Sequence, residues 1–414
     1  MEGRRGSGGG EGAGRVYKPR GLLGNLYIGG VCGYMDLGFR GVTAIYGRPG
    51  VGKTTLAMRM AHERLQRGER VLWVSLYEDK ETFHKNASLL GYDLSKADFW
   101  DFVFVRTDAM LNQIVSAVSQ EAYGLVVVDS MSSVLEGAQA REYLINAVYR
   151  VFKPAGVDLV AIAEEESATP LDYVVDNLLR LEMRLANGVT ERRMYVVKSR
   201  GRRAGYYVEF DILEGRGLVF IDELPKPAAR GGFEAWSDAV SQAVGPIKGG
   251  CAYLFLGGAL TPLLAKAAAD LSKAGLKVLY RVQGKDAESV RRLVEKFGGK
   301  AVVQRAAPRP QSYFAHVMSL YESLNETGAD VVVSDGVDLE FLLYGKKALD
   351  INLHEVQELR GLGVALLIGM SRDRGLRHAA DAVVSIRGGE AVAHTPEGRR
   401  ICKVEHAPEP ALAC

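Results

Sequence analysis

The second half of this chain repeats the first half at a nearly constant offset. The segment GERVLWVS begins at Gly68 and aligns with GLKVLYRV, which begins at Gly275. Further along, VDLVAIAEEE from Val157 aligns with VALLIGMSRD from Val364, so both pairs are 207 residues apart. The segment GLVVVDS likewise resembles ADVVVSD, which ends at Asp335. Because similar segments in the same order at one spacing indicate a duplicated unit, the sequence predicts two copies of one α/β domain.

Within the first copy, short apolar segments alternate with segments of helical periodicity. Helices are expected over 53–67 and 80–90, and strands over 42–46, 70–77, 103–106, 125–129 and 157–163. Strands joined by helical crossovers form a mostly parallel sheet with helices on both faces. After Asn177 the segments LLRLEMRL, RRMYVVK, YYVEFDI and GLVFI are separated by short connections, which predicts an antiparallel extension of the sheet.

The pattern divides the 414 residues into five parts. We expect a flexible glycine-rich tail (1–20), a first α/β domain (21–224), a linker (225–245), a second α/β domain (246–405) and a short tail (406–414). The 52 Lys and Arg residues nearly balance the 50 Asp and Glu residues, for a net charge of +2. This balance argues against a generally basic nucleic-acid coat, although a local basic patch remains open.

The cysteines and the hydropathy of the chain indicate the cellular compartment in which it is expected. The four cysteines are dispersed with no Cys-x-x-Cys pair, so neither a disulfide framework nor a zinc site is indicated, and a reducing cytoplasm fits best. The glycine-rich N-terminus has no apolar stretch of the kind found in secretory signals. The uncharged run 249–265 is shorter than the roughly 20 residues of a membrane span. It matches the first strand, loop and helix of the second copy, so no membrane segment is expected.

The sequence GRPGVGKTT, residues 47–55, fits the pattern G-x-x-x-x-G-K-[ST] between an expected strand and an expected helix. Small residues allow backbone N–H groups to surround phosphate oxygens, and the helix N-terminus adds partial positive charge. We expect Lys53 to reach the β- and γ-phosphates and the Thr54 hydroxyl to bind Mg²⁺. The predicted nucleotide-binding residues share this loop and are Gly47, Gly50, Val51, Gly52, Lys53, Thr54 and Thr55.

Carboxylates follow two of the other expected strands. Asp129 ends the apolar segment LVVVD and is expected to hold Mg²⁺ together with Thr54. Glu78 and Asp79 follow the second strand and are the candidates for activating the attacking water. No Asn-Lys-x-Asp guanine-recognition motif occurs, so ATP is the expected nucleotide and Mg²⁺ the expected metal.

These motifs together resemble a known family. The segments GRPGVGKTT, VSLYEDKETFHKNASLLGYDL, LVVVDS and VVKSRGR are similar to those of the KaiC-like branch of the RecA superfamily of ATPases, over about residues 22–222. The resemblance implies a RecA-like P-loop domain with a mostly parallel sheet. In that family two adjacent glutamates supply the catalytic carboxylate. Here Tyr77 and Glu78 occupy those positions, so Glu78 is the expected catalytic carboxylate and the tyrosine predicts slow hydrolysis.

The family also uses a Lys-x-Arg motif that contacts the γ-phosphate bound to the neighbouring subunit. Lys198-Ser199-Arg200 matches this motif, so the resemblance implies catalytic roles for Lys198 and Arg200 in a shared site. Cationic donors of this kind stabilise the charge on the transferring phosphoryl group. A site shared head to tail implies a homo-oligomer, a hexameric ring or a filament. The alternative interpretation of the motif is a basic strand end in an arginine-rich stretch.

The second copy lacks the phosphate-binding residues. Where the loop is expected, it has LFLGGALTPLL, which is shorter and has no lysine. We therefore expect a degenerate RecA-like domain that serves packing, assembly or a protein partner. Three functions remain open: a regulatory or assembly ATPase, a recombinase-like DNA-binding ATPase of the RadA or RadB type, and an ATP-dependent oligomerisation switch without hydrolysis. The basic stretch 198–205 favours the second and Tyr77 the third, whereas the near-neutral charge favours the first.

Overall fold

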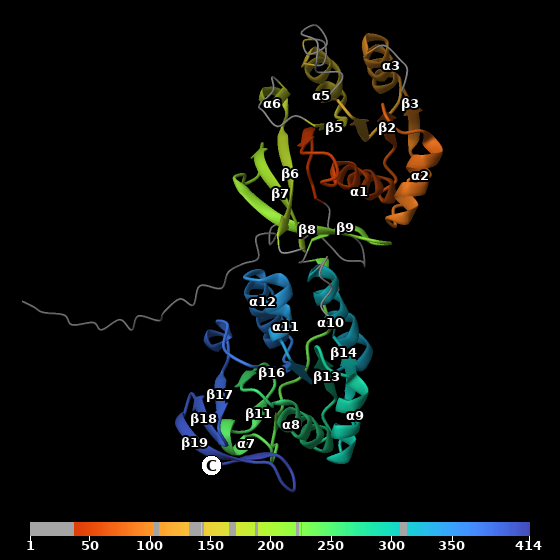
Figure 1. Cartoon of the computed structure of the whole chain (residues 1–414). Helices are drawn as coiled ribbons and strands as arrows, with labels where there is room; N and C mark the ends of the chain where they lie inside the picture. The colour runs from red at the N-terminus through yellow and green to blue at the C-terminus, as the bar shows by residue number, and fades with distance from the viewer. Residues whose placement is uncertain are drawn as a thin grey trace, which may run out of the picture.

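The computed structural model describes residues 37–102, 107–131, 142, 145–164, 171–186, 189–220, 223–224, 226–306 and 313–414. Two α/β domains follow one another along the chain (Figure 1). Each contains a nine-stranded sheet whose parallel strands are covered by helices on both faces. The predicted fold class, a RecA-like P-loop domain duplicated as a second α/β domain, is confirmed.

The first sheet has the strand order β3-β2-β4-β5-β1-β6-β7-β8-β9. Its strands are β1 (Val42–Tyr46), β2 (Val71–Ser75), β3 (Asp98–Asp101), β4 (Leu125–Asp129), β5 (Asp158–Ala163), β6 (Asn177–Ala186), β7 (Val189–Ser199), β8 (Tyr206–Leu213) and β9 (Gly217–Phe220). Strands β1 to β6 pair in parallel and β6 to β9 pair antiparallel, as predicted. The strand expected over 103–106 lies outside the described residues.

Helices cover both faces of the first sheet. They are α1 (Lys53–Gln66), α2 (Lys80–Leu89), α3 (Thr107–Gln120), α5 (Lys153–Ala155) with the preceding π-helical turn η1 (Val148–Phe152), and α6 (Leu171–Val174). Helices α1 and α2 pack on one face, around Trp73 and Phe83. Helix α3 and η1 pack on the other face, around Met110 and Phe152. The strands between these two apolar layers are continuously buried, as expected for a parallel sheet covered on both sides.

The second sheet has the order β14-β13-β15-β16-β12-β17-β18-β19-β20, which repeats the first sheet position by position. Its strands are β12 (Ala252–Leu256), β13 (Val278–Val282), β14 (Val302–Arg305), β15 (Val331–Asp335), β16 (Ala365–Met370), β17 (Ala382–Arg387), β18 (Glu390–Thr395), β19 (Gly398–Glu405) and β20 (Ala411–Ala413). Strand β13 lies 207 residues after β2, the offset at which the sequence repeats. The described arrangement therefore fits a duplicated domain.

The helices of the second domain are α8 (Thr261–Lys273), α9 (Ala287–Lys296), α10 (Tyr313–Thr327), α11 (Asp338–Tyr344), α12 (Lys347–Gly361) and the 3-10 turn η3 (Leu376–His378). The run 249–265 forms β12 and the start of α8, and none of the described helices has the length and apolar character needed to cross a bilayer. Helices α8 and α9 cover one face of the sheet, and α10 and α12 cover the other.

The structure corrects the expected linker and C-terminal tail. Strands β10 (Glu234–Ala235) and β11 (Ile247–Lys248) pair, and helix α7 (Ser241–Val244) packs into the second core, so the described part of 225–245 belongs largely to the second domain. Strand β20 pairs with β19, with Leu412 buried, instead of forming a tail. The sequence pattern missed these elements because each is only two to four residues long.

A disulfide joins Cys402 of β19 to Cys414, next to β20. The expectation that the cysteines indicate no disulfide was therefore wrong for this pair. The antiparallel pairing of β19 and β20 brings the two residues together, and cysteine spacing alone does not reveal that pairing. Among the described residues Cys251 is a free cysteine.

The hairpin β8–β9 of the first domain lies against the second domain (Figure 1). Leu213 and Val219 of this hairpin belong to the same apolar cluster as the α10–α12 face of the second domain. Arg216 pairs with Glu322 of α10 at 2.8 Å, and Lys347 of α12 pairs with Glu209. The antiparallel extension of the first sheet thus forms the interface between the domains.

Candidate functional site

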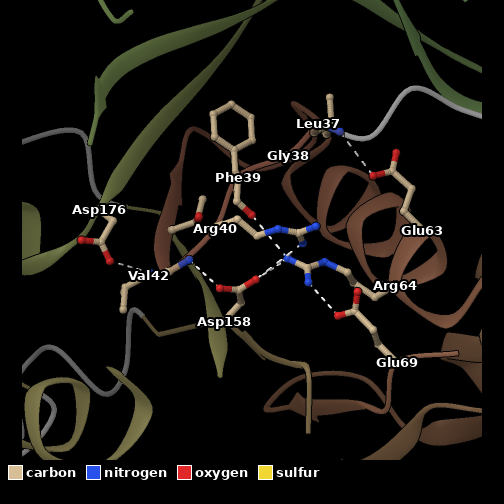
Figure 2. A network of polar contacts seen from close by, with 12 residues as sticks. Leu37, Gly38, Phe39, Arg40, Val42, Glu63, Arg64, Glu69, Asp158 and Asp176 are labelled. Carbon is tan, nitrogen blue, oxygen red and sulfur yellow. Dashed lines mark hydrogen bonds and ion pairs between the residues drawn. The ribbon is translucent and has the colours of Figure 1, made fainter. Parts of the chain in front are cut away.

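The segment before β1 is fixed by charged side chains, which sets the position of the loop that follows β1 (Figure 2). The Asp158 carboxylate accepts from the backbone N–H of Gly41 at 2.5 Å and pairs with Arg64 of α1. Asp176 accepts from the N–H of Val42 at 2.9 Å. These contacts tie β1 to α1, β5 and the start of β6, the elements that surround the predicted phosphate-binding loop.

The loop leads from Tyr46 at the end of β1 to Lys53 at the start of α1. Gly52 has φ 106° at the N-cap of α1, no side chain caps the helix, and its first turn has no acidic residue. The first backbone N–H groups of a helix have no partner within it, and together with the helix dipole they favour an anion. The N-terminus of α1 is therefore suited to hold a phosphate.

Two glycines of the loop lie where a side chain would not fit. A Cβ atom on Gly47 would be 2.6 Å from the carbonyl oxygen of Leu181, and one on Gly52 would be 2.8 Å from Cδ1 of Ile212. Both residues also have positive φ, which disfavours other residue types. Gly47 is thus required by the close approach of the β6 backbone, and Gly52 by its positive φ.

Lys53 is 7% exposed and lies at the centre of the loop. Its ammonium donates to the carbonyl oxygens of Gly47 at 2.7 Å and Arg48 at 3.1 Å, and lies 3.9 Å from Glu164. Burial lowers the pKa of Lys53, whereas the charges of Glu164 and Asp129 act against that shift. The ammonium thus already lies inside the loop that would surround a phosphate.

Thr54 and Asp129 meet beside the loop. The Thr54 hydroxyl donates to Oδ2 of Asp129 at 2.8 Å. Burial raises the pKa of Asp129, and the hydrogen bond from Thr54 and the charge of Lys53 oppose the rise. A hydroxyl and a carboxylate oxygen are ligands of the kind that Mg²⁺ takes in such sites, so these residues fit the predicted metal.

Glu78 follows β2 on the same edge of the sheet. Its carboxylate accepts from Nδ2 of Asn86 at 2.5 Å, and its backbone N–H donates to Ser75 Oγ at 2.9 Å. Ser75, which holds the Glu78 backbone, pairs with Asp129 across β2 and β4, and the charge of Glu78 contributes to raising the pKa of Asp129. Glu78 is thus held near the Thr54–Asp129 pair.

Asp79, the other predicted candidate for water activation, has a local role. It is the N-cap of α2 and accepts from the backbone N–H and the hydroxyl of Thr82, both at 2.9 Å. The backbone hydrogen bond from Thr82 lowers the pKa of Asp79. A capping carboxylate of this kind stabilises a helix start, so the geometry favours Glu78 over Asp79.

The other predicted loop residues differ in exposure. Val51 is buried in the apolar layer beneath the loop, Thr55 is half-buried in α1, and a Cβ on Gly50 would meet nothing within 4 Å. The side chains of Val51 and Thr55 therefore contribute to packing and helix formation, while their backbone N–H groups belong to the loop. Gly50 leaves the outer side of the loop open.

Glu164 is a further residue of the candidate site, and the sequence analysis did not single it out. It directly follows β5, which pairs with β1, and its charge acts on both Lys53 and Asp129. A carboxylate at the end of a strand adjacent to the loop strand was the signal available in the sequence.

Lys198 lies near the end of β7, and Arg200 directly follows the strand. Lys198 donates to the carbonyl oxygen of Asp172 at 2.7 Å, and Arg200 pairs with Asp176 at 3.3 Å. Burial and the charge of Arg200 lower the pKa of Lys198. Within the described part of the chain, their side-chain bonds reach residues 172–176 and not Lys53 or Asp129.

Comparison with known proteins agrees with this geometry. Residues 37–224 match the family model described as "ATPase: KaiC". The circadian clock protein KaiC2 of Synechocystis is 29% identical over 202 residues, which cover 43% of this chain and 35% of that protein. Protein GvpD2 of Halobacterium salinarum is 30% identical over 185 residues, 38% of this chain and 37% of that protein.

A third relative is a DNA repair protein. The DNA repair protein RadA of Campylobacter jejuni is 26% identical over 197 residues, 44% of this chain and 42% of that protein. The chain thus spans less than half the length of each of these three curated relatives. The phosphate-binding loop, the Thr54–Asp129 pair and the family match together identify residues 37–224 as a domain of the KaiC-like branch of the RecA superfamily of P-loop ATPases.

Proposed function

We propose that this chain is an ATP-binding, slowly hydrolysing ATPase that acts as an oligomeric regulatory or assembly module. The observation that carries the proposal is the meeting of Lys53, Thr54 and Asp129 at the uncapped N-terminus of α1. A phosphate oxygen in the loop would replace the carbonyl acceptors of Lys53. A cytoplasmic location, where ATP and Mg²⁺ are plentiful, belongs to the same proposal.

Each residue has a distinct role in this proposal. The loop N–H groups and Lys53 hold the β- and γ-phosphates, while Thr54 and Asp129 hold Mg²⁺, which when bound neutralises phosphate charge. Glu78 orients the attacking water and accepts its proton. Tyr77, 69% exposed, stands where the family has a second glutamate, so a single carboxylate performs this step and turnover is slow.

The oligomer follows from the Lys-x-Arg motif. The side chains of Lys198 and Arg200 bond to residues 172–176 and not to Lys53 or Asp129, and Arg200 is exposed, which supports a role on the ATP of a neighbouring subunit in a ring or filament. The second domain serves assembly or binds a protein partner. Measuring particle size with and without ATP–Mg²⁺, alongside phosphate release, tests the proposal; a monomer unaffected by nucleotide and without turnover would refute it.

A recombinase-like DNA-binding ATPase is the second candidate, favoured by the similarity to RadA and by the basic stretch 198–205. Contacts within the chain weigh against it, because Lys198, Arg200 and Arg202 all bond to residues of the first domain. Stimulation of turnover by single-stranded DNA that weakens steeply with salt would support this candidate, since phosphate contacts release counterions. Indifference to DNA would support the regulatory ATPase.

Glu78→Gln should lower the rate of ATP hydrolysis about 100-fold while ATP binding is retained. The amide keeps the shape of the side chain and the acceptor for Asn86 but cannot take a proton from water. Phosphate release and nucleotide titration measure the two effects. Asp79→Asn is the matched control, expected to keep turnover because Asp79 caps α2. Unchanged hydrolysis in Glu78→Gln would show that Glu78 does not activate the water and that another base does so.

Titration of the full chain should show one bound ATP per subunit at saturation. In the second domain Leu260 stands at the position of Lys53, and only four residues separate β12 from α8, where six separate β1 from α1. This connection provides neither the lysine nor the length to surround a triphosphate. Isothermal titration counts the sites, and a second equivalent of similar affinity would contradict the degenerate-domain interpretation.

A further inference from the structure

The second domain keeps one part of the nucleotide site although it has lost the loop. Thr261 at the start of α8 lies 207 residues after Thr54, and Asp335 ends β15 as Asp129 ends β4. The Thr261 hydroxyl donates to Oδ2 of Asp335 at 2.6 Å, which repeats the contact between Thr54 and Asp129. The duplicated domain therefore holds a matching threonine–aspartate pair.

A lysine reaches this pair in the second domain. Lys285 follows β13 and lies 207 residues after Glu78, so the carboxylate position of the first domain is occupied by an ammonium. Lys285 Nζ lies 3.2 Å and 3.3 Å from the two carboxylate oxygens of Asp335 and also donates to the Thr261 hydroxyl. The charge at this position is thus the opposite of that in the first domain.

Asp335 is 1% exposed, so a cation beside it stabilises its charged form. Its carboxylate also accepts from the Tyr280 hydroxyl, which reaches Oδ2 at 3.0 Å and supplies no charge. A buried carboxylate without a compensating charge is strongly unfavourable. The Lys285 side chain is 44% exposed, so it enters the site from the surface, as a metal ion would.

We propose that the Lys285 ammonium takes the place of the metal ion in the second domain and holds the Thr261–Asp335 pair without magnesium or nucleotide. This inference rests on the proposed role of Thr54 and Asp129 as metal-binding residues in the first domain. An ammonium has three donors, and here they reach the hydroxyl and both carboxylate oxygens. The junction between β15 and α8 is then fixed in every nucleotide state of the first domain.

Hydrogen exchange of the full chain, followed in peptides from α8 and β15, tests the charge pairing. Lys285→Met should raise exchange in these peptides about tenfold, because Asp335 loses its counter-charge. Lys285→Arg should restore protection, and the double variant Lys285→Met/Asp335→Asn should exchange more slowly than Lys285→Met alone. Lys300→Met, at an exposed lysine of the same domain, is the matched control. Equal exchange in Lys285→Met and the unaltered chain would overturn the proposal.

Replacement of the metal is tested with Mn²⁺ alone. Lys285→Glu restores the carboxylate of the first domain and should raise exchange further, since two acidic groups then lie together. Millimolar Mn²⁺ should restore protection of α8 and β15 in Lys285→Glu and have no effect on these peptides in the unaltered chain. Absence of protection in Lys285→Glu, or equal protection of the unaltered chain, would overturn the proposal.

The two proposals are separated by measuring both domains in one experiment. Binding of ATP–Mg²⁺ to the first domain should be unchanged in all Lys285 variants. If the unaltered chain binds no nucleotide, the proposed function fails, while the exchange of α8 and β15 still reports on Lys285.

Discussion

Lys53→Ala should weaken the binding of ATP–Mg²⁺ about 10³-fold. The ammonium is buried in the loop, and its partners among the described residues are carbonyl oxygens and the Glu164 carboxylate, so bound phosphate would gain a directed cationic donor. Loss of one partner from a buried, hydrogen-bonded charge pair costs about 4 kcal/mol, which corresponds to this factor. Nucleotide titration by calorimetry measures the change directly.

A matched variant separates this effect from a general loss of positive charge. Lys80→Ala removes an exposed lysine at the start of α2 and should leave the affinity for ATP unchanged. Circular dichroism of both variants checks that the sheet and helices remain. If folded Lys53→Ala bound ATP–Mg²⁺ as tightly as the unaltered chain, the assignment of the phosphate-binding loop would be wrong.

The first sheet and its site could be predicted because local signals determine them. Strand β4 was predicted at its exact bounds, and α1 differs from prediction by one residue at its end. The motif GRPGVGKTT predicts a strand, a loop and a helix, and Asp129 ends an apolar segment typical of a strand buried in a parallel sheet. Thr54 and Asp129 then meet because parallel strands bring their carboxyl ends to one edge of the sheet.

Other features depend on pairings between distant segments, which a single sequence does not encode locally. The Cys402–Cys414 disulfide and strand β20 require the fold-back of the chain end onto β19. Glu164 lies beside Lys53 because β5 pairs with β1, and the sequence alone does not show that pairing. Lys285 stands at the repeat offset from Glu78, but only the structure shows its contact with Asp335.

Arg200→Ala should lower the rate of ATP hydrolysis on the order of 10³-fold and leave ATP binding to the same subunit intact. The reason is that its guanidinium bonds to Asp176 and the Tyr173 carbonyl and makes no bond to the loop among the described residues. Arg67→Ala, which removes an exposed arginine at the end of α1 opposite the loop, is the matched control and should keep full turnover. Loss of ATP binding together with turnover in Arg200→Ala would instead indicate a role within one subunit.

Mixing two inactive variants tests whether the site is shared. Subunits with Glu78→Gln have an intact Arg200, and subunits with Arg200→Ala have an intact Glu78, so some interfaces of a mixed ring or filament contain both functional residues. With equal amounts and free exchange, about a quarter of the interfaces should combine an intact loop site with an intact neighbouring arginine, and phosphate release should recover to roughly that fraction. Exchange is verified by energy transfer between differently labelled subunits. Because neither variant has both residues in one chain, recovered activity requires that Arg200 act across a subunit boundary, whereas verified exchange without recovery would limit Arg200 to its own chain.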